Sequence, residues 1–142
     1  MRVGRPGAVA ACRLSEHSGA LDALLARRRS AEHAKRASLA QAQARLEQAE
    51  RHLGRLENDF VRARREIDRT GAAPAAHLER AVAAARSAVL LCRTETDELR
   101  NHALVAIRER EAAEALKTRR MTERTAREAR KEERELEEAN QA

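Results

Sequence analysis

Apolar residues recur along this chain with the heptad period that is typical of coiled-coil helices. The first stretch has seam residues at alternating steps of three and four: Leu39, Ala42, Leu46, Ala49, Leu53, Leu56, Phe60, Ala63 and Ile67. The second stretch repeats the same steps of three and four: Leu78, Val82, Ala85, Val89, Cys92, Thr96, Leu99, Ala103 and Ala106. Each stretch therefore predicts one long helix with a narrow apolar seam.

Gly and Pro residues divide the chain into few elements. Gly4, Pro6 and Gly7 predict a flexible tail over residues 1–13. Gly71 suits a helix C-cap and Pro74 suits the first turn of a helix, so residues 71–74 read as a short turn. We expect helix 1 over about residues 15–70 and helix 2 over about residues 75–138, which together make a single hairpin domain over 14–142.

Short helix-helix connections place neighbouring helices antiparallel. If the chain folds back at this turn, seam faces seam when the numbers of facing residues add to 145, so Ile67 faces Leu78 and Leu39 faces Ala106. The predicted fold is all-α: a long two-helix antiparallel coiled-coil hairpin.

The same register brings cations together near the termini. Lys35 would face Arg110, and Arg28 would face Lys117. Unpaired charge is strongly unfavourable in a dry core, so we expect a tight half near the turn and a splayed or hydrated half near the termini. Two alternatives remain open for these side chains: they snorkel outward, or carboxylates turn inward to neutralise them, namely Glu109, Glu111 and Glu114.

Composition favours a thin core and leaves two readings of the excess positive charge: a solvated face with spare arginines, or a surface for an acidic partner. Of the 142 residues 37% are charged and only Phe60 is aromatic, so a thick globular core is not expected. The net charge of +6 lies in the first half, because residues 75–142 hold equal numbers of acidic and basic side chains. Nucleic acid is a poor fit, since stacking aromatics and zinc-finger spacing are absent from the sequence.

Catalytic motifs are absent from the sequence. It has no Gly-rich phosphate loop, no HExxH and no nucleophile elbow. Its five histidines form no i,i+4 pair, and Cys12 and Cys92 form no CxxC pair. We expect a non-enzyme with no cofactor, no metal site and no membrane span, since no apolar run reaches about 20 residues.

Beyond Leu116 the apolar seam of helix 2 is lost, and the helix ends in the charged run Arg130-Lys131-Glu132-Glu133-Arg134-Glu135-Leu136-Glu137-Glu138. A hairpin of this size with such a C-terminal helix resembles the central stalk proteins of type III secretion and flagellar export ATPases (FliJ/YscO-type family). Flagellar members often place an aromatic after the acidic pair, where this chain has Ala139. The injectisome branch is therefore the closer resemblance.

The resemblance implies a cytoplasmic stalk, peripheral to an inner-membrane secretion apparatus. Its terminal end would enter a hexameric secretion ATPase, promote its activity and couple it to the export gate protein; some family members also handle secretion chaperones. We expect the ATPase to contact a basic girdle in the terminal half of the hairpin. Its members are Arg27, Arg28, Arg29, Lys35, Arg36, Arg108, Arg110, Lys117, Arg119 and Arg120.

The main alternative is a generic coiled-coil scaffold or tether that forms a dimer of hairpins. It is motivated by apolar residues that lie off the seam and suit packing against another hairpin: Leu90, Leu91, Leu104, Val105 and Ile107. A stalk would be a monomer or at most a weak homo-oligomer. A third reading, a basic helical protein associated with nucleic acid, predicts steeply salt-dependent DNA binding.

Overall fold

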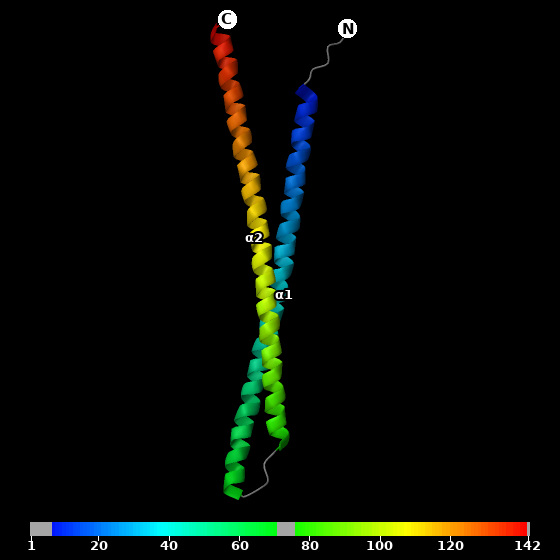
Figure 1. Cartoon of the computed structure of the whole chain (residues 1–142), viewed down its shortest axis with the longest axis vertical. Coiled ribbons are helices and arrows are strands. Elements are labelled where there is room, and N and C mark those ends of the chain that lie inside the picture. The colour runs from blue at the N-terminus through cyan, green and yellow to red at the C-terminus, as the bar shows by residue number, and fades with distance from the viewer. Residues whose placement is uncertain (1–6, 71–75, 142) are drawn as a thin grey trace. The chain divides into compact units, whose positions relative to one another are not determined.

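The chain forms two long helices, which confirms the predicted all-α hairpin. The computed structural model describes the backbone of residues 7–70 and 76–141 and the side chains of residues 19–70 and 76–141. Helix α1 spans Gly7–Thr70 and helix α2 spans Ala76–Gln141 (Figure 1). The predicted turn at residues 71–74 lies outside the described residues.

Both helices extend further than the sequence pattern predicted. α1 begins at Gly7, so residues 7–13 are helical and the prediction of a flexible tail is wrong for them. The physical reason is the run Ala8, Val9, Ala10 and Ala11, whose alanines have the highest helix propensity. Residues 1–6 lie outside the described residues. α2 continues to Gln141, three residues past the predicted end.

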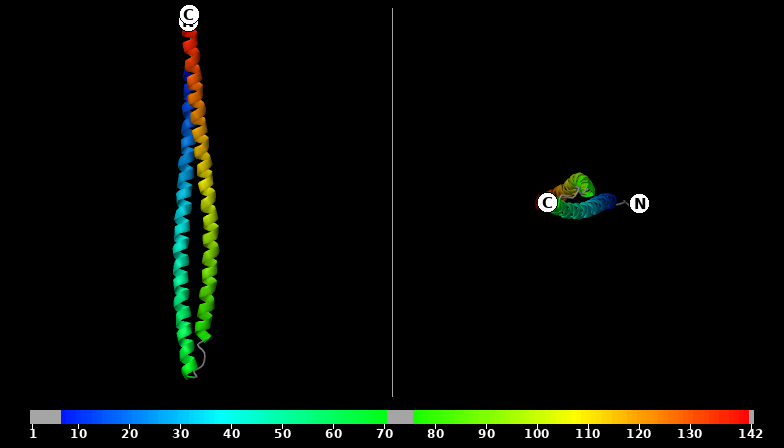
Figure 2. Two further views of the ribbon diagram at one scale, coloured as in Figure 1. Left: turned by 90° about the vertical axis from the view of Figure 1, so that its left-hand side faces the viewer. Right: turned by 90° about the horizontal axis from the view of Figure 1, so that it is seen from below.

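The hairpin divides into two compact units, each built from a segment of both helices. The inner unit comprises residues 33–105, and the terminal unit comprises residues 1–32 and 106–142. Within each unit the α1 segment and the α2 segment run antiparallel beside each other (Figure 1, Figure 2).

The inner unit buries the predicted seam. Every seam residue of α1 from Leu39 to Ile67 is buried or half-buried. The same holds for every seam residue of α2 from Leu78 to Ala103. Ala42, Val89 and Thr96 are among the most deeply buried. Thr96 satisfies its hydroxyl by donating a hydrogen bond to the Cys92 carbonyl one turn earlier, at 2.7 Å. The core of this unit is therefore one residue wide on each helix.

The terminal unit is packed from Leu21 to Glu32 of α1 and from Ala106 to Lys117 of α2, so the prediction of a splayed or hydrated half near the termini is wrong for these residues. Leu21 and Leu25 of α1 are buried, as are Ala106 and Ala113 of α2. Leu25 is only 4% exposed, although the predicted register placed it opposite Arg120. Carboxylates neutralise the seam cations here, as the ion pairs below show, and the helices can therefore approach.

Candidate partner-binding surfaces

Ion pairs between the helices flank the seam of the inner unit. Glu50 accepts a hydrogen bond from Arg93 at 2.8 Å, and Glu57 accepts one from Arg86 at 2.8 Å. On the other flank Arg45 donates to Glu95 at 2.6 Å. All six side chains are more than a third exposed, so each pair contributes about 0.5 kcal/mol at most. Their main effect is to favour the antiparallel orientation.

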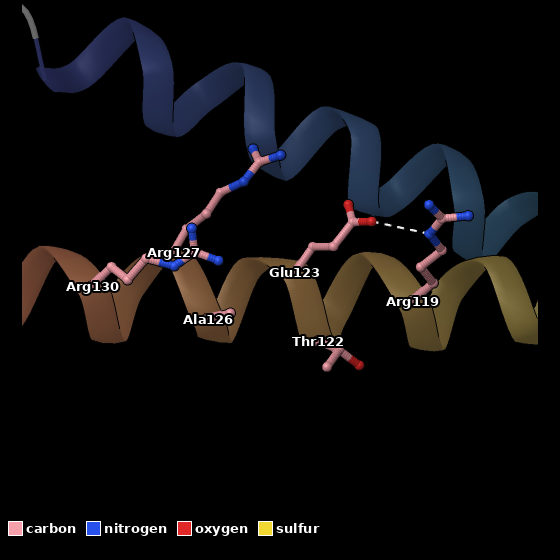
Figure 3. A pocket seen from close by; sticks show the side chains of 6 residues that line it. All are labelled: Arg119, Thr122, Glu123, Ala126, Arg127 and Arg130. Atoms are coloured by element: carbon pink, nitrogen blue, oxygen red, sulfur yellow. Dashed lines mark hydrogen bonds and ion pairs between the residues drawn. The ribbon is translucent and has the colours of Figure 1, made fainter.

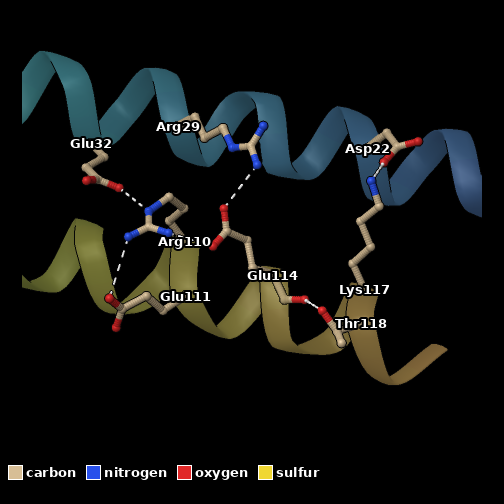
Figure 4. A network of polar contacts seen from close by, with 8 residues as sticks. All are labelled: Asp22, Arg29, Glu32, Arg110, Glu111, Glu114, Lys117 and Thr118. Atoms are coloured by element: carbon tan, nitrogen blue, oxygen red, sulfur yellow. Dashed lines mark hydrogen bonds and ion pairs between the residues drawn. The ribbon is translucent and has the colours of Figure 1, made fainter. Parts of the chain in front are cut away.

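The terminal unit contains a polar layer inside the seam. Glu32 occupies a seam position of α1 with its side chain only 6% exposed, and it accepts a hydrogen bond from Arg110 of α2 at 2.5 Å. The Arg110 side chain is 22% exposed and also reaches Glu114 at 2.6 Å and Glu111 at 3.5 Å (Figure 4). The predicted register placed Lys35 opposite Arg110. In the structure Arg110 binds Glu32 instead, which lies three residues earlier on α1.

Further carboxylates pair with the other cations of this unit. Arg29 donates to Glu114 at 3.1 Å, so that Glu114 bridges Arg29 of α1 and Arg110 of α2 (Figure 4). Two pairs complete the set: Arg28 with Glu109 and Lys117 with Asp22, each at 2.6 Å. The predicted opposition of Arg28 to Lys117 is thereby replaced by two ion pairs. All three carboxylates expected to neutralise the seam cations pair with one of them: Glu109, Glu111 and Glu114.

This network shifts the pKa of two of its members. The hydrogen bond to Glu32 raises the pKa of Arg110, although partial desolvation opposes the shift. The hydrogen bond from Arg29 lowers the pKa of Glu114, and the charge of Arg110 acts in the same direction. Both shifts favour the charged forms, so the network is held together as ions near neutral pH.

The predicted basic girdle consequently divides into two sets. Arg28, Arg29, Arg110 and Lys117 bind carboxylates across the hairpin, and Arg119 binds Glu123 on its own helix at 3.1 Å. Four exposed cations have no carboxylate partner among the described residues: Arg27, Lys35, Arg108 and Arg120. Arg36 is exposed and has a polar interaction.

The predicted off-seam apolar residues lie on α2, and four of them are exposed. Leu90 is 62% exposed, Leu91 73%, Leu104 45% and Val105 51%, and all four belong to the inner unit. Ile107 belongs to the terminal unit and is half-buried, so it offers less surface to a partner. Leu90 and Leu104 are two heptads apart, as are Leu91 and Val105, so the two members of each pair lie on a similar face of the helix, and the two pairs are about 100° apart around it. We call these four residues the α2 apolar patch.

The described residues contain neither a cluster of metal-ligating side chains nor a membrane-spanning helix. No three His, Cys, Asp or Glu side chains among them converge as metal ligands. No helix in the described part of the chain combines the length and apolar character needed to cross a membrane. Cys92 is a half-buried free thiol on the seam.

The fold and its surfaces define the class of this protein as an all-α helical hairpin. Comparisons with protein-family models, curated proteins and solved structures found no match.

Two features of the site were missed by reasoning from the sequence. Glu32 and Asp22 were not recognised as ion-pair partners, because the predicted register places Glu32 opposite Ala113 and Asp22 opposite Glu123. The sequence did contain a signal for these pairs. Each cation of the terminal seam has an acidic residue within one helical turn on its own helix. The other missed feature is a stripe of basic residues beyond Lys117, described below.

Proposed function

We propose that this protein is a non-enzymatic coiled-coil stalk that binds partner proteins and couples them mechanically. The supporting observation is the burial pattern of the inner unit, in which two helices bury a seam one residue wide and leave their remaining faces to solvent. Such a hairpin presents long, rigid surfaces and suits mechanical coupling or recognition better than chemistry that needs a sheltered cleft.

We further propose that the partner is the hexameric ATPase of a type III secretion system, with coupling to the export gate. The resemblance of the charged C-terminal helix to export-ATPase stalks supports this form of the proposal. The ion pairs of the terminal unit refine which cations would take part, because Arg28 and Arg29 already hold the hairpin together. Arg27, Arg108 and Arg120 are the girdle members of the terminal unit that stay available to an acidic partner surface.

The test is co-purification with a hexameric secretion ATPase from the same organism, together with its rate of ATP hydrolysis. The chain should bind the ATPase and raise this rate. Reversing Arg27, Arg108 and Arg120 to Glu should weaken binding by about tenfold, since each lost contact and each new repulsion costs a few tenths of a kcal/mol or more.

A matched control reverses three arginines of the inner unit to Glu: Arg55, Arg62 and Arg65, which are exposed and lack an ion pair among the described residues. This variant has the same net charge and should bind within about twofold of the natural chain. The ATPase assignment fails if the chain neither binds nor stimulates the enzyme, or if the two variants bind equally weakly.

A second candidate, a scaffold that dimerises through its hairpins, is favoured by the α2 apolar patch. Leu90 and Leu91 are adjacent and are 62% and 73% exposed, and exposed apolar side chains that adjoin one another are typical of interaction sites. Light scattering at micromolar concentration separates the candidates, because a stalk is a monomer alone and the scaffold is a dimer. If a dimer forms, replacing Leu91 and Val105 with Ser should return it to a monomer.

A further inference from the structure

The heptad period of α2 continues past its last buried residue, but its positions change from apolar to basic. From Ala106 the steps of four and three pass through Arg110, Ala113 and Lys117. The next five positions are all basic: Arg120, Arg124, Arg127, Lys131 and Arg134, which we call the basic stripe. Only two other basic residues occur between positions 118 and 141, namely Arg119 and Arg130. The basic residues are therefore concentrated on the face that forms the seam elsewhere.

The stripe is poorly neutralised within the chain. All five side chains are exposed. Arg124 pairs with Glu128 at 2.8 Å and Lys131 with Glu135 at 3.6 Å, both within one turn of the same exposed helix. The remaining three members have no carboxylate partner in the described part of the chain: Arg120, Arg127 and Arg134. Exposed pairs within one turn are weak, so all five cations can meet an external carboxylate.

The α1 segment of the terminal unit is poor in acids by sequence, and its Asp22 already pairs with Lys117. Between residues 1 and 21 the sequence holds a single acid, Glu16. An open cavity of about 560 Å³ lies on this side of α2, lined by Arg119, Thr122, Glu123, Ala126, Arg127 and Arg130. Arg127 extends from α2 toward α1, on the side where Arg119 and Glu123 are joined (Figure 3). The terminal unit thus leaves room beside the stripe.

Acidic residues border the stripe and restrict its partner. Residues 118–141 carry seven acidic and seven basic side chains, hence no net charge, and five of the acids adjoin a stripe position in the sequence: Glu123, Glu128, Glu132, Glu133 and Glu135. A duplex nucleic acid, with phosphates along both edges of its grooves, would be repelled by these borders. A partner helix with a narrow row of carboxylates could instead contact the basic stripe alone. Basic residues on either side of that row would then contact the acidic residues that border the stripe.

We propose that the basic stripe is a docking surface for an acidic helix of a partner protein, with carboxylates at heptad spacing. Arg120, Arg127 and Arg134 are seven residues apart, or about 10 Å along the helix axis, and a second helix repeats at the same interval. The stripe shares only Arg120 with the basic girdle. The proposal requires no ATPase, so it stands or falls independently of the function proposed above.

The experiment uses the full chain and a labelled synthetic peptide of about 21 residues, which gives three heptads. The peptide has Glu at both core positions of each heptad, Lys at the flanking positions and Ala elsewhere. Binding is followed by fluorescence anisotropy at about 50 mM salt, where surface electrostatics are least screened. The variant replaces Arg120, Arg127 and Arg134 with Gln, whose helix propensity is close to that of Arg. We expect its affinity to fall by about tenfold.

The matched control replaces Arg55, Arg62 and Arg65 with Gln and should bind within about twofold of the natural chain. A peptide of identical composition with its Glu residues off the heptad positions should bind about tenfold more weakly. Circular dichroism verifies that both variants keep their helix content. Equal losses in the two variants, equal binding of the two peptides, or tighter binding of a DNA duplex would each overturn the proposal. Self-association of the chain that the stripe variant abolishes would also overturn it, in favour of a second copy as the occupant.

Discussion

Glu32 and Arg110 mark the place where the seam changes its chemistry. Removing Arg110 would take this partner from the buried Glu32, and removing Glu32 would take one from the half-buried Arg110; either loss is costlier than replacing both with apolar side chains. Because a polar layer of this kind is satisfied in only one register, we infer that it specifies how the two helices of the terminal unit align.

Glu114 makes this network sensitive to acid. Its pKa is lowered from the ordinary 4.5, chiefly by the hydrogen bond from Arg29. A lowered folded-state pKa contributes stability that is present above the unfolded pKa and lost as the pH falls through the folded one. At about pH 6, Glu114→Gln should therefore lower the melting temperature, and the difference between the two chains should shrink as the pH falls below 4.5 and through the lowered pKa of Glu114.

Thermal unfolding followed by circular dichroism at several pH values measures this effect. Glu137→Gln is the control, because Glu137 is exposed and has no ion pair among the described residues. It should follow the natural chain at every pH. A Glu114→Gln chain whose melting temperature stays parallel to that of the natural chain down to pH 3 would contradict the role assigned to this carboxylate.

At the scale of the helix, α2 carries one heptad period through three kinds of surface. Its core positions in the inner unit are apolar except for Thr96; in the terminal unit they are mixed from Ala106 to Lys117 and basic from Arg120 to Arg134. Only the apolar part obtains substantial stability from burial, because exposed ion pairs contribute little. The same periodicity thus serves folding in one segment and remains available for recognition in another.

Two neighbouring residues of α2 test this distinction. Val89 is 4% exposed, so Val89→Ala loses about 1.6 kcal/mol of transfer free energy, which the helix propensity of Ala reduces by about 0.5. With the cavity that remains, the expected loss is about 1.5 kcal/mol in the free energy of unfolding. Leu91→Ala, at a residue 73% exposed, should change it by about 0.5 kcal/mol or less.

Urea unfolding at low protein concentration measures both values. If Leu91→Ala proves as costly as Val89→Ala under these conditions, the assignment of the seam is wrong. A cost for Leu91→Ala that appears only as the protein concentration rises would instead support the dimeric scaffold, because mass action then couples association to stability.

At the scale of the whole molecule, stability and recognition lie in different parts of the chain. Residues 130–141 are exposed throughout, so they bury almost nothing. Ending the chain after Ala129 should change the free energy of unfolding by about 0.5 kcal/mol or less, while the helical circular dichroism signal falls with the lost residues. Chemical unfolding of the two chains provides the comparison, and a loss of about 2 kcal/mol or more would show that this segment packs on the remainder.

Long helices and their phase could be predicted from the sequence because a heptad period is a local property that each helix displays by itself. The seam from Leu39 to Ala103 and the exposure of Leu90 and Leu91 followed directly from that period. The start of α1 could not be predicted, since Gly7 signals a break while the alanines after it favour helix.

Only the tertiary structure decided which charges meet. One turn of longitudinal shift leaves an apolar seam nearly unchanged, but it decides whether Arg110 faces Lys35 or Glu32. Ion pairing depends on distances of a few ångströms between particular atoms, and these emerge only when both helices are placed together. The sequence by itself thus determined a helical hairpin with a basic terminal half, while the structure showed that about half of those cations bind carboxylates of the hairpin itself.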